Sequence, residues 1–305
     1  MALMNLYYRV KPLLPRRVQI SLRRGIAVRR RRVHRHDWPI LPAAARPPAA
    51  WGGWPEGKKF ALVLTHDVET SAGAEKCDLL AALETKLGFR SSFNFVPEDY
   101  RVDDALRARL AASGFEVGLH GLKHDGKLFE SRKAFTENAR RINGYLKDWG
   151  AVGFRAPSMQ HNLAWLAELD VEYDASTYDT DPFEPESDNM ETVFPFRYAS
   201  SAHPAGYVEL PYTLPQDHCL FVILKEKSPA VWKEKLDWIA QSGGMALLNT
   251  HPDYMGFGDA RPAAEEYPVG YYIEFLGYAK QRYGNAYWHV LPRDIARFWR
   301  AASLP

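Results

Sequence analysis

Residues 60–69 read FALVLTHDVE, and this stretch indicates the fold of the chain. Its first five residues are apolar, which is the composition of a strand buried on both faces. Polar residues capable of catalysis follow immediately. Further along, short apolar runs alternate with amphipathic segments, a pattern that predicts βαβ units and a mostly parallel sheet.

The alternation predicts short strands with helices between them. Eight strands are expected, at residues 60–65, 91–96, 115–119, 152–154, 171–173, 207–210, 246–248 and 287–290. Helices are expected at residues 78–87, 103–112, 131–149, 229–241 and 271–278. This order favours a barrel or distorted barrel in the α/β class, and a doubly wound open sheet is the alternative.

The N-terminal region differs in composition from the rest of the chain. Of the 39 lysines and arginines, 11 lie in residues 1–36, which contain no acidic residue. The remainder has 28 basic and 37 acidic residues, a net charge of −9. A stretch rich in proline, alanine and glycine follows the arm. We therefore predict a basic arm and linker over residues 1–55 and one barrel domain over residues 56–305.

The basic arm predicts an anionic partner. Contact with an anionic membrane through residues 1–36 is one candidate, and sugar phosphates are another. Nucleic acid is not expected, because the body is acidic and offers no recognition module. No apolar run approaches the roughly 20 residues of a membrane span, no secretory signal is apparent, and the only cysteines are Cys77 and Cys219. We expect a cytoplasmic protein that its arm could hold at the inner face of the membrane.

Residues with catalytic potential share one position, just past the C-terminal end of a predicted strand. In a parallel barrel those ends meet on one face, where such barrels carry their active sites. We therefore expect these side chains to converge. They are Asp67 and Glu69 after the first strand, His120 and His124 after the third, Arg155 after the fourth, and His251 after the seventh.

His120 and His124 are four residues apart, so one helical turn would point both imidazoles the same way. With one carboxylate they would form a metal site with positions left open for water, as a hydrolase needs. Zinc is the expected ion, although other divalent first-row metals also suit this ligand set. Of Asp67 and Glu69, one would bind the ion and the other would accept a proton from water.

Two further residues have candidate roles. His251 could protonate a leaving amine, because an unperturbed imidazole titrates near neutral pH. Arg155 could orient Asp67 through a bidentate contact.

The ordered motifs resemble the polysaccharide deacetylase family, the carbohydrate esterases that share the nodulation-deacetylase homology domain. They are LTHD at 64–67, SFNFVP at 92–97, HGLKH at 120–124, FRAP at 154–157, YDAS at 173–176 and HP at 251–252. The resemblance covers about residues 59 to 251. It implies a distorted (β/α)7 barrel that the remaining C-terminal segment closes. In this chain the barrel would carry a basic N-terminal extension.

The resemblance also implies that His120 and His124 hold a divalent metal, that an aspartate of the first motif is the general base, and that His251 is the general acid. Arg155 would position the base. Backbone N–H groups near the ion would help to stabilise the oxyanion.

The sequence departs from the family pattern in two places. The family usually has adjacent aspartates in the first motif, whereas Val68 follows Asp67 here. We therefore assign Asp67 as the base and Glu69 as the metal ligand; the reverse, or a part for His66, stays open. Gly121 stands where the family usually has a serine or threonine that supports the histidine loop.

The resemblance implies a hydrolase that removes an N-acyl group, expected to be acetyl, from a sugar during surface-polysaccharide biosynthesis. The substrate would be a nucleotide-linked or lipid-linked precursor. One alternative is an amide hydrolase with a non-sugar substrate, as allantoinase-like relatives illustrate. Another is a catalytically degenerate barrel that only binds saccharide.

Overall fold

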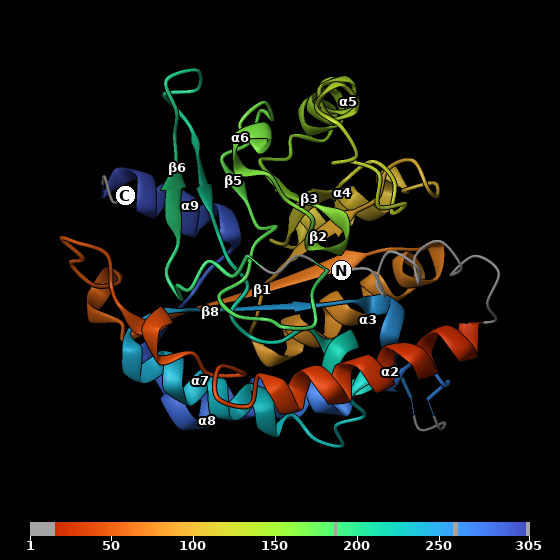
Figure 1. Cartoon of the computed structure of the whole chain (residues 1–305), viewed down its shortest axis with the longest axis vertical. Coiled ribbons are helices and arrows are strands. Elements are labelled where there is room, and N and C mark those ends of the chain that lie inside the picture. The colour runs from red at the N-terminus through yellow and green to blue at the C-terminus, as the bar shows by residue number, and fades with distance from the viewer. Residues whose placement is uncertain (1–15, 186–187, 259–261, 303–305) are drawn as a thin grey trace.

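The computed structural model describes residues 16–185, 188–258 and 262–302 (Figure 1). At its centre lies β1 (Phe60–Val68), in which every residue is buried. Along one edge β1 pairs with β8 (Met245–Thr250). Along the other edge it pairs first with β11 (Tyr287–His289) and then, nearer its C-terminal end, with β2 (Ser92–Phe95). The FALVLTHDVE stretch therefore forms the central strand of the sheet.

The remaining strands extend the sheet from β2, and all but one of them run parallel. The parallel strands are β3 (Glu116–His120), β4 (Gly153–Arg155), β5 (Tyr173–Asp174) and β7 (Tyr207–Glu209). The exception, β6 (Phe196–Tyr198), is antiparallel to β7 at the end of the sheet. A separate two-stranded sheet joins β9 (Met255–Gly256) to β10 (Tyr267–Pro268).

The sheet curls back on itself beyond β7. Isolated parallel bridges join Tyr178 to Tyr212 and Leu214 to Leu248, and Leu248 belongs to β8, the neighbour of β1. The circuit therefore runs through seven parallel strands: β1, β2, β3, β4, β5, β7 and β8. This is the distorted (β/α) barrel that the sequence predicts, and the alternative of a doubly wound open sheet is excluded. The eighth predicted strand, β11, lies beside the start of β1, outside this circuit.

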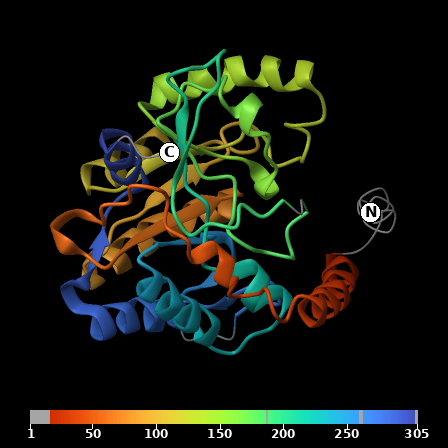
Figure 2. The same ribbon diagram turned by 60° about the vertical axis from the view of Figure 1, so that its left-hand side comes forward.

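Helices cover the outside of the sheet. In Figure 1, α7 and α8 lie along one side of β1 and β8, and α5 lies on the opposite side of the molecule; Figure 2 shows the same layers from another direction. The helices that follow strands are α3 (Ser71–Leu87), α4 (Asp104–Ala112), α5 (Arg132–Trp149), α6 (Leu163–Leu166), α7 (Ala230–Ser242), α8 (Gly270–Tyr283) and α9 (Pro292–Ala301). Short 3₁₀ turns complete the chain: η2 (Pro42–Ala45), η3 (Pro55–Gly57), η4 (Pro157–Met159), η6 (Pro252–Tyr254) and η7 (Gly284–Ala286).

The helix ends follow from local side chains. Thr70 caps α3 and Ser131 caps α5, each by accepting a hydrogen bond from a backbone N–H in the first turn. Gly88, Gly150 and Gly243 adopt the left-handed conformation directly after α3, α5 and α7. These glycines end the predicted helices as expected.

The N-terminal region is more structured than its composition suggests. Residues Arg16–Val33 form helix α2, which lies across the molecule in front of α7 and α8 in Figure 1. Trp38, Ala44 and Trp54, all within the predicted linker, are buried in the main hydrophobic core. The division of the chain at residue 55 stays a prediction, but the residues ahead of it share the core of the barrel.

Among the helices within residues 16–185, 188–258 and 262–302, none is both long enough and apolar enough to cross a bilayer.

Candidate active site

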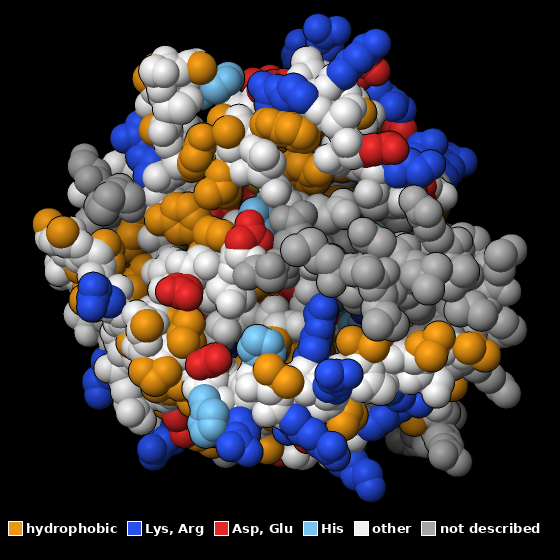
Figure 3. Space-filling view, in the orientation of Figure 1, with side chains coloured by type: hydrophobic (Ala, Val, Ile, Leu, Met, Phe, Trp, Pro, Cys, Tyr) orange, Lys and Arg blue, Asp and Glu red, His pale blue; other side chains and the backbone are white. Residues whose placement is uncertain are grey.

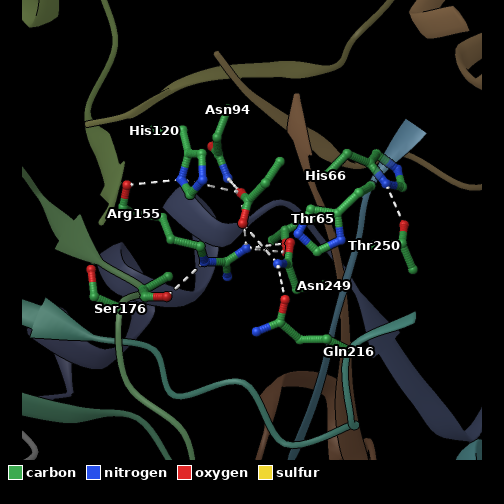
Figure 4. Close-up of polar contacts among 12 residues, drawn as sticks. Thr65, His66, Asn94, His120, Arg155, Ser176, Gln216, Asn249 and Thr250 are labelled. Atoms are coloured by element: carbon green, nitrogen blue, oxygen red, sulfur yellow. Dashed lines mark hydrogen bonds and ion pairs between the residues drawn. The ribbon is translucent and has the colours of Figure 1, made fainter. Parts of the chain in front are cut away.

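The end of β1 divides its side chains between two environments, because successive residues of a strand point to opposite faces. Asp67 and Glu69 line a cavity at the C-terminal ends of the strands. His66 lies on the other face, where its ring contacts Thr250 Oγ1 at 2.7 Å and Glu84 Oε1 at 2.8 Å (Figure 4). His66 therefore takes no part in the cavity, and that open alternative is excluded.

Asp67 is fully enclosed by hydrogen-bond donors. Its Oδ1 accepts from the Nδ2 of Asn94 at 3.0 Å, and its Oδ2 accepts from the Nδ2 of Asn249 at 2.8 Å. Burial opposes ionisation of this carboxyl, but His120 and Arg155 together hold its pKa well below the usual range. The side chain is therefore an ionised carboxylate at neutral pH. Sequence reasoning did not single out Asn94, although it lies in the quoted SFNFVP motif.

Glu69, His120 and His124 come together beside Asp67. One ligand atom from each of the three side chains lies within 4.8 Å of the others. The two imidazole rings are 5.4 Å apart between centroids, and His124 Nε2 lies 3.1 Å from Glu69 Oε1. The structure thus gathers the three predicted metal-ligating residues into one cluster.

The donor set of this cluster fits a divalent ion. His120 Nδ1 donates to the carbonyl of Arg155 at 3.1 Å, which fixes the ring. Its Nε2 is buried and, among the described residues, has no hydrogen-bond partner. Burial lowers the pKa of His120 to about 4, which keeps the imidazole in the neutral form that binds metals. An orphaned, neutral ring nitrogen beside a carboxylate and a second imidazole suits a metal ligand.

Three polar residues outside the predicted set support the ligands. Tyr254 donates its hydroxyl to Glu69 Oε2 at 2.7 Å, and Asp253 Oδ2 accepts from the backbone N–H of Glu69 at 3.0 Å. Asp99 Oδ2 accepts from the backbone N–H of His124 at 2.6 Å. Asp253 and Tyr254 lie in the short 3₁₀ turn η6 and Asp99 lies in a loop, and no periodic pattern marks them in the sequence.

His251 faces the cluster from the end of β8. Its Nε2 lies 3.8 Å from Glu69 Oε1. On the far side of the ring, Nδ1 donates to Asp217 Oδ1 at 2.6 Å, while the hydroxyl of Tyr267 donates to Asp217 Oδ2 at 3.0 Å. Burial alone would lower the pKa of His251, but Asp217 and Glu69 raise it to about 10. His251 is therefore an imidazolium with its Nε2 directed at the site. Asp217, which follows the sixth predicted strand in the sequence, is its direct partner.

Arg155 is completely buried, and Figure 4 shows it close to Thr65 and Asn249. Its Nε donates to the carbonyl of Ala175 at 2.7 Å, and its Nη1 donates to Thr65 Oγ1 at 2.8 Å and also contacts Asn249 Oδ1. The same Nη1 lies 3.4 Å from Asp67 Oδ1. The expected bidentate contact with Asp67 is therefore wrong, because one nitrogen is shared among three oxygens.

Gly121 is explained by its surroundings. Its φ of +67° lies in the left-handed region, and a Cβ atom at this position would come within 2.6 Å of the ring of Pro157. A serine or threonine would therefore clash with the proline of the FRAP motif. Glycine here lets the chain turn between His120 and His124 while it packs on Pro157.

The cluster opens into a cavity of about 270 Å³. Its walls combine the acid and base candidates with residues of the loops after β5 and β7 and with one face of α2. Besides the site residues they include Ser158, Met159, Phe183, Glu184, Gln216, His218, Ile223 and Tyr254.

Comparison with known proteins identifies relatives by structure alone. No family model matches the sequence, and no curated protein matches it. A Mycobacterium smegmatis structure assigned as a polysaccharide deacetylase superposes with a TM-score of 0.65 at 19% identity, over 85% of this chain and 96% of that one. A Pseudomonas aeruginosa PAO1 structure assigned to the same group gives 0.57 at 18% identity, over 84% and 95%.

The chain has the polysaccharide deacetylase fold. A structure described as Puue allantoinase has the same fold, with a TM-score of 0.58 at 18% identity over 84% of this chain and 94% of that one. The polysaccharide deacetylase fold therefore does not by itself decide between a sugar and a non-sugar amide. That choice depends on the cavity.

Proposed function

We propose that this protein is a metal-dependent hydrolase that removes an N-acyl group, in the first instance acetyl, from a sugar. One observation carries the proposal. Glu69, His120 and His124 form a cluster fit for a divalent ion, with an ionised Asp67 on one side and a protonated His251 on the other. The deacetylase assignments of the structures that share the fold support an acetylated saccharide as substrate.

The three clustered side chains would hold the ion. Two imidazoles and one carboxylate are a ligand set that zinc accepts while keeping positions open, and other divalent first-row metals also suit it. The ion would supply Lewis acidity, polarising the acyl carbonyl and a water molecule.

The remaining side chains move the protons. Asp67, held by Asn94, Asn249 and Arg155, would accept a proton from the water that attacks the acyl carbon. His251 would donate the proton on its Nε2 to the departing amine as the carbon–nitrogen bond breaks. Asp217 keeps the opposite ring nitrogen of His251 engaged, so only Nε2 faces the cavity. The products are a carboxylic acid and the free amino sugar.

The contacts favour Asp67 as the base and Glu69 as the metal ligand. Glu69 lies 3.1 Å from His124 Nε2 and belongs to the cluster, whereas Asp67 lies outside the cluster and lines the cavity beside it. A role in surface-polysaccharide biosynthesis, in the cytoplasm and with a nucleotide-linked or lipid-linked precursor, is the setting that we propose for this activity.

The proposal is tested by metal content and acetate release in the wild type and in His120→Ala and His124→Ala. We expect one bound divalent ion and acetate release from N-acetyl sugars in the wild type only. Lys123→Ala, an exposed residue between the two ligands, is the matched control and should behave as the wild type. Hydrolysis of cyclic or linear non-sugar amides alone would show that the substrate is a non-sugar amide and not an N-acylated sugar. A metal-loaded protein that hydrolyses neither N-acetyl sugars nor non-sugar amides would contradict the hydrolase, and saccharide binding without catalysis would be the remaining function.

A further inference from the structure

Helix α2 is packed against the barrel by a specific set of contacts. Ile20 and Ala27 are buried against Ile223 of the π-helical segment η5 (His218–Ile223). Arg24 adds two hydrogen bonds to the carbonyl of Val222, at 3.1 and 3.3 Å. Arg31 pairs with Glu226. The helix is therefore fixed in place, and Figures 1 and 2 both show it alongside the body of the molecule.

One stripe of α2 forms a wall of the active-site cavity. Arg23, Ile26, Ala27 and Arg30 all line the cavity that also holds Asp67, Glu69 and the three histidines of the site. These four positions follow the spacing i, i+3, i+4, i+7, which places them on one face of a helix. Figure 3 shows lysine and arginine side chains gathered along the part of this surface where α2 runs.

The two arginines of this stripe differ in how they are held. Arg30 Nη1 donates to the carbonyls of Pro182 at 2.8 Å and of Glu184 at 3.2 Å, so its guanidinium is oriented by the loop after β5. Arg23 is exposed, and it makes no hydrogen bond or ion pair with any residue in the described part of the chain. Among the residues that the structure describes, the cavity therefore has one guanidinium held by hydrogen bonds and one without them on the same wall.

Glu184, which lines the same cavity, does not neutralise this wall. Glu184 accepts hydrogen bonds from the hydroxyl of Tyr212 at 2.9 Å and from Gln216 Nε2 at 2.6 Å. Burial and the nearby Asp181 raise the pKa of Glu184 to about 8, so the carboxyl is mostly protonated at neutral pH. The wall formed by α2 is accordingly cationic.

We infer that Arg23 and Arg30 bind a phosphate group of the substrate, which makes the substrate an N-acylated sugar phosphate. This inference rests on the proposed function and adds the class of sugar to it. Guanidinium groups form forked, charge-assisted hydrogen bonds with phosphate oxygens. Residues seven apart lie about 10 Å apart along a helix, so the two side chains would converge on one phosphate or bind the two phosphates of a diphosphate.

The phosphate could carry either a nucleoside or a lipid, and both sources share the chemistry that the two arginines recognise. The cavity is open to solvent beside α2, so either group would extend past the helix. The experiment distinguishes these two sources by comparing a nucleotide, UDP, with a prenyl phosphate.

The subsite is tested by binding, without the metal and without turnover. In the full-length His120→Ala, His124→Ala double variant treated with chelator, titration calorimetry with UDP, N-acetylglucosamine 1-phosphate and a prenyl phosphate in detergent measures phosphate binding. We expect Arg23→Gln to weaken binding about tenfold and the Arg23→Gln, Arg30→Gln pair to weaken it further. The contacts that dock α2 come from Ile20, Arg24, Ala27 and Arg31, so we expect substitution of Arg23 to leave this docking intact.

The matched control removes the same charge from the same helix outside the cavity. Arg29→Gln with Arg32→Gln, both exposed and absent from the cavity wall, should leave the affinity within about twofold, since distant exposed charges are screened. Equal weakening in both pairs, or no binding of any of the three phosphates, would overturn the subsite. Tighter binding of UDP identifies a nucleotide-linked substrate, and tighter binding of the prenyl phosphate identifies a lipid-linked one.

A second readout uses the metal-loaded enzyme. The ratio of kcat/KM for N-acetylglucosamine 1-phosphate to that for N-acetylglucosamine should fall in Arg23→Gln and stay unchanged in the Arg29, Arg32 control. If no sugar is hydrolysed, the proposed function fails while the binding titration still decides the phosphate subsite. If sugars are hydrolysed but the ratio of the two kcat/KM values is the same in Arg23→Gln and in the wild type, the phosphate subsite is contradicted and the proposed hydrolase function is retained.

Discussion

Asp217 accepts two hydrogen bonds from His251, one from the ring Nδ1 at 2.6 Å and one from the backbone N–H at 2.8 Å. The same carboxylate therefore sets both the position of the residue and the orientation of its ring. Because it is a buried negative charge in direct contact, it also stabilises the imidazolium form.

Asp217→Asn should lower kcat and move its basic limb to lower pH. The pKa of His251 is raised to about 10 from an ordinary value of 6.5, so the proton needed for the leaving amine is present at neutral pH. Without the Asp217 charge, the proton is lost as the pH rises through a lower value. We expect about a 10- to 100-fold loss at pH 8 and a smaller loss at pH 6. A pH profile of kcat measures the position of the basic limb. A basic limb at the same pH in Asp217→Asn and the wild type would show that His251 is not the general acid.

Asp67→Asn and Glu69→Gln should separate the base from the metal ligand. Glu69→Gln removes the carboxylate of the cluster, so metal affinity should fall at least about 100-fold, together with activity. Asp67→Asn should keep the metal while kcat falls about 100- to 10,000-fold. Metal titration beside acetate release distinguishes the two. Loss of the metal in Asp67→Asn alone would reverse the assignment.

Gly121→Ser should destabilise the protein by about 1–3 kcal/mol, because it combines a left-handed backbone with a clash against Pro157. Gly126→Ser is the matched control: its φ is +73°, but nothing lies within 4 Å of an added Cβ. The control should lose only the backbone contribution, about 1 kcal/mol. Chemical denaturation of both variants gives the comparison. Equal losses would show that the contact with Pro157 is unimportant.

The free energy of unfolding should depend on pH through Glu116, which lies outside the candidate active site. Its carboxyl is buried in β3 and accepts hydrogen bonds from the Tyr173 hydroxyl and the backbone of Arg293. Burial raises its pKa to about 7 from 4.5, so the folded state binds this proton more tightly than the unfolded state. The resulting stability is present below pH 4.5 and is lost as the pH rises through 7, about 3 kcal/mol in all.

Glu116→Gln provides the measurement for this effect. The difference in free energy of unfolding between the wild type and Glu116→Gln should change in favour of the variant between pH 4.5 and pH 7. Denaturation at several pH values measures it. A difference that is constant across this range would contradict the shifted pKa.

The barrel and its clustered residues were predictable because both depend on local patterns. Short apolar runs mark the strands, and the rule that parallel strands share one functional face places Asp67, Glu69, His120, His124 and His251 together. Two boundaries differ clearly from the prediction: β1 runs on to Val68, so that Asp67 belongs to the strand, and α3 begins at Ser71, seven residues before the predicted start.

The partners of these residues were not predictable. Asp217, Asn94, Tyr254 and Asp253 act through contacts that depend on strand register and loop conformation, and polar loop residues carry no periodic signal. Asp217 comes 34 positions before His251 and reaches it only because β8 lies beside the segment that follows β7.

The role of α2 was hidden by its composition. An arginine-rich segment is typical of a solvated arm. The contact of α2 with the barrel combines two buried apolar side chains, Ile20 and Ala27, with polar contacts of its arginines. The sequence suggested that the arm is separable from the catalytic domain. In the structure α2 forms one wall of the cavity. Removal of this helix should therefore impair hydrolysis of a soluble substrate as well.

The ladder between β1 and β8 has six consecutive pairs, from Ala61 with Met245 to His66 with Thr250. The proposed base and acid each lie one residue beyond this ladder, on adjacent strands of the barrel. Their separation is thus governed by backbone hydrogen bonds that resist thermal motion, while His124 lies in a loop. The spacing of the two proton-transfer groups is therefore independent of the conformation of the loops that line the rest of the cavity.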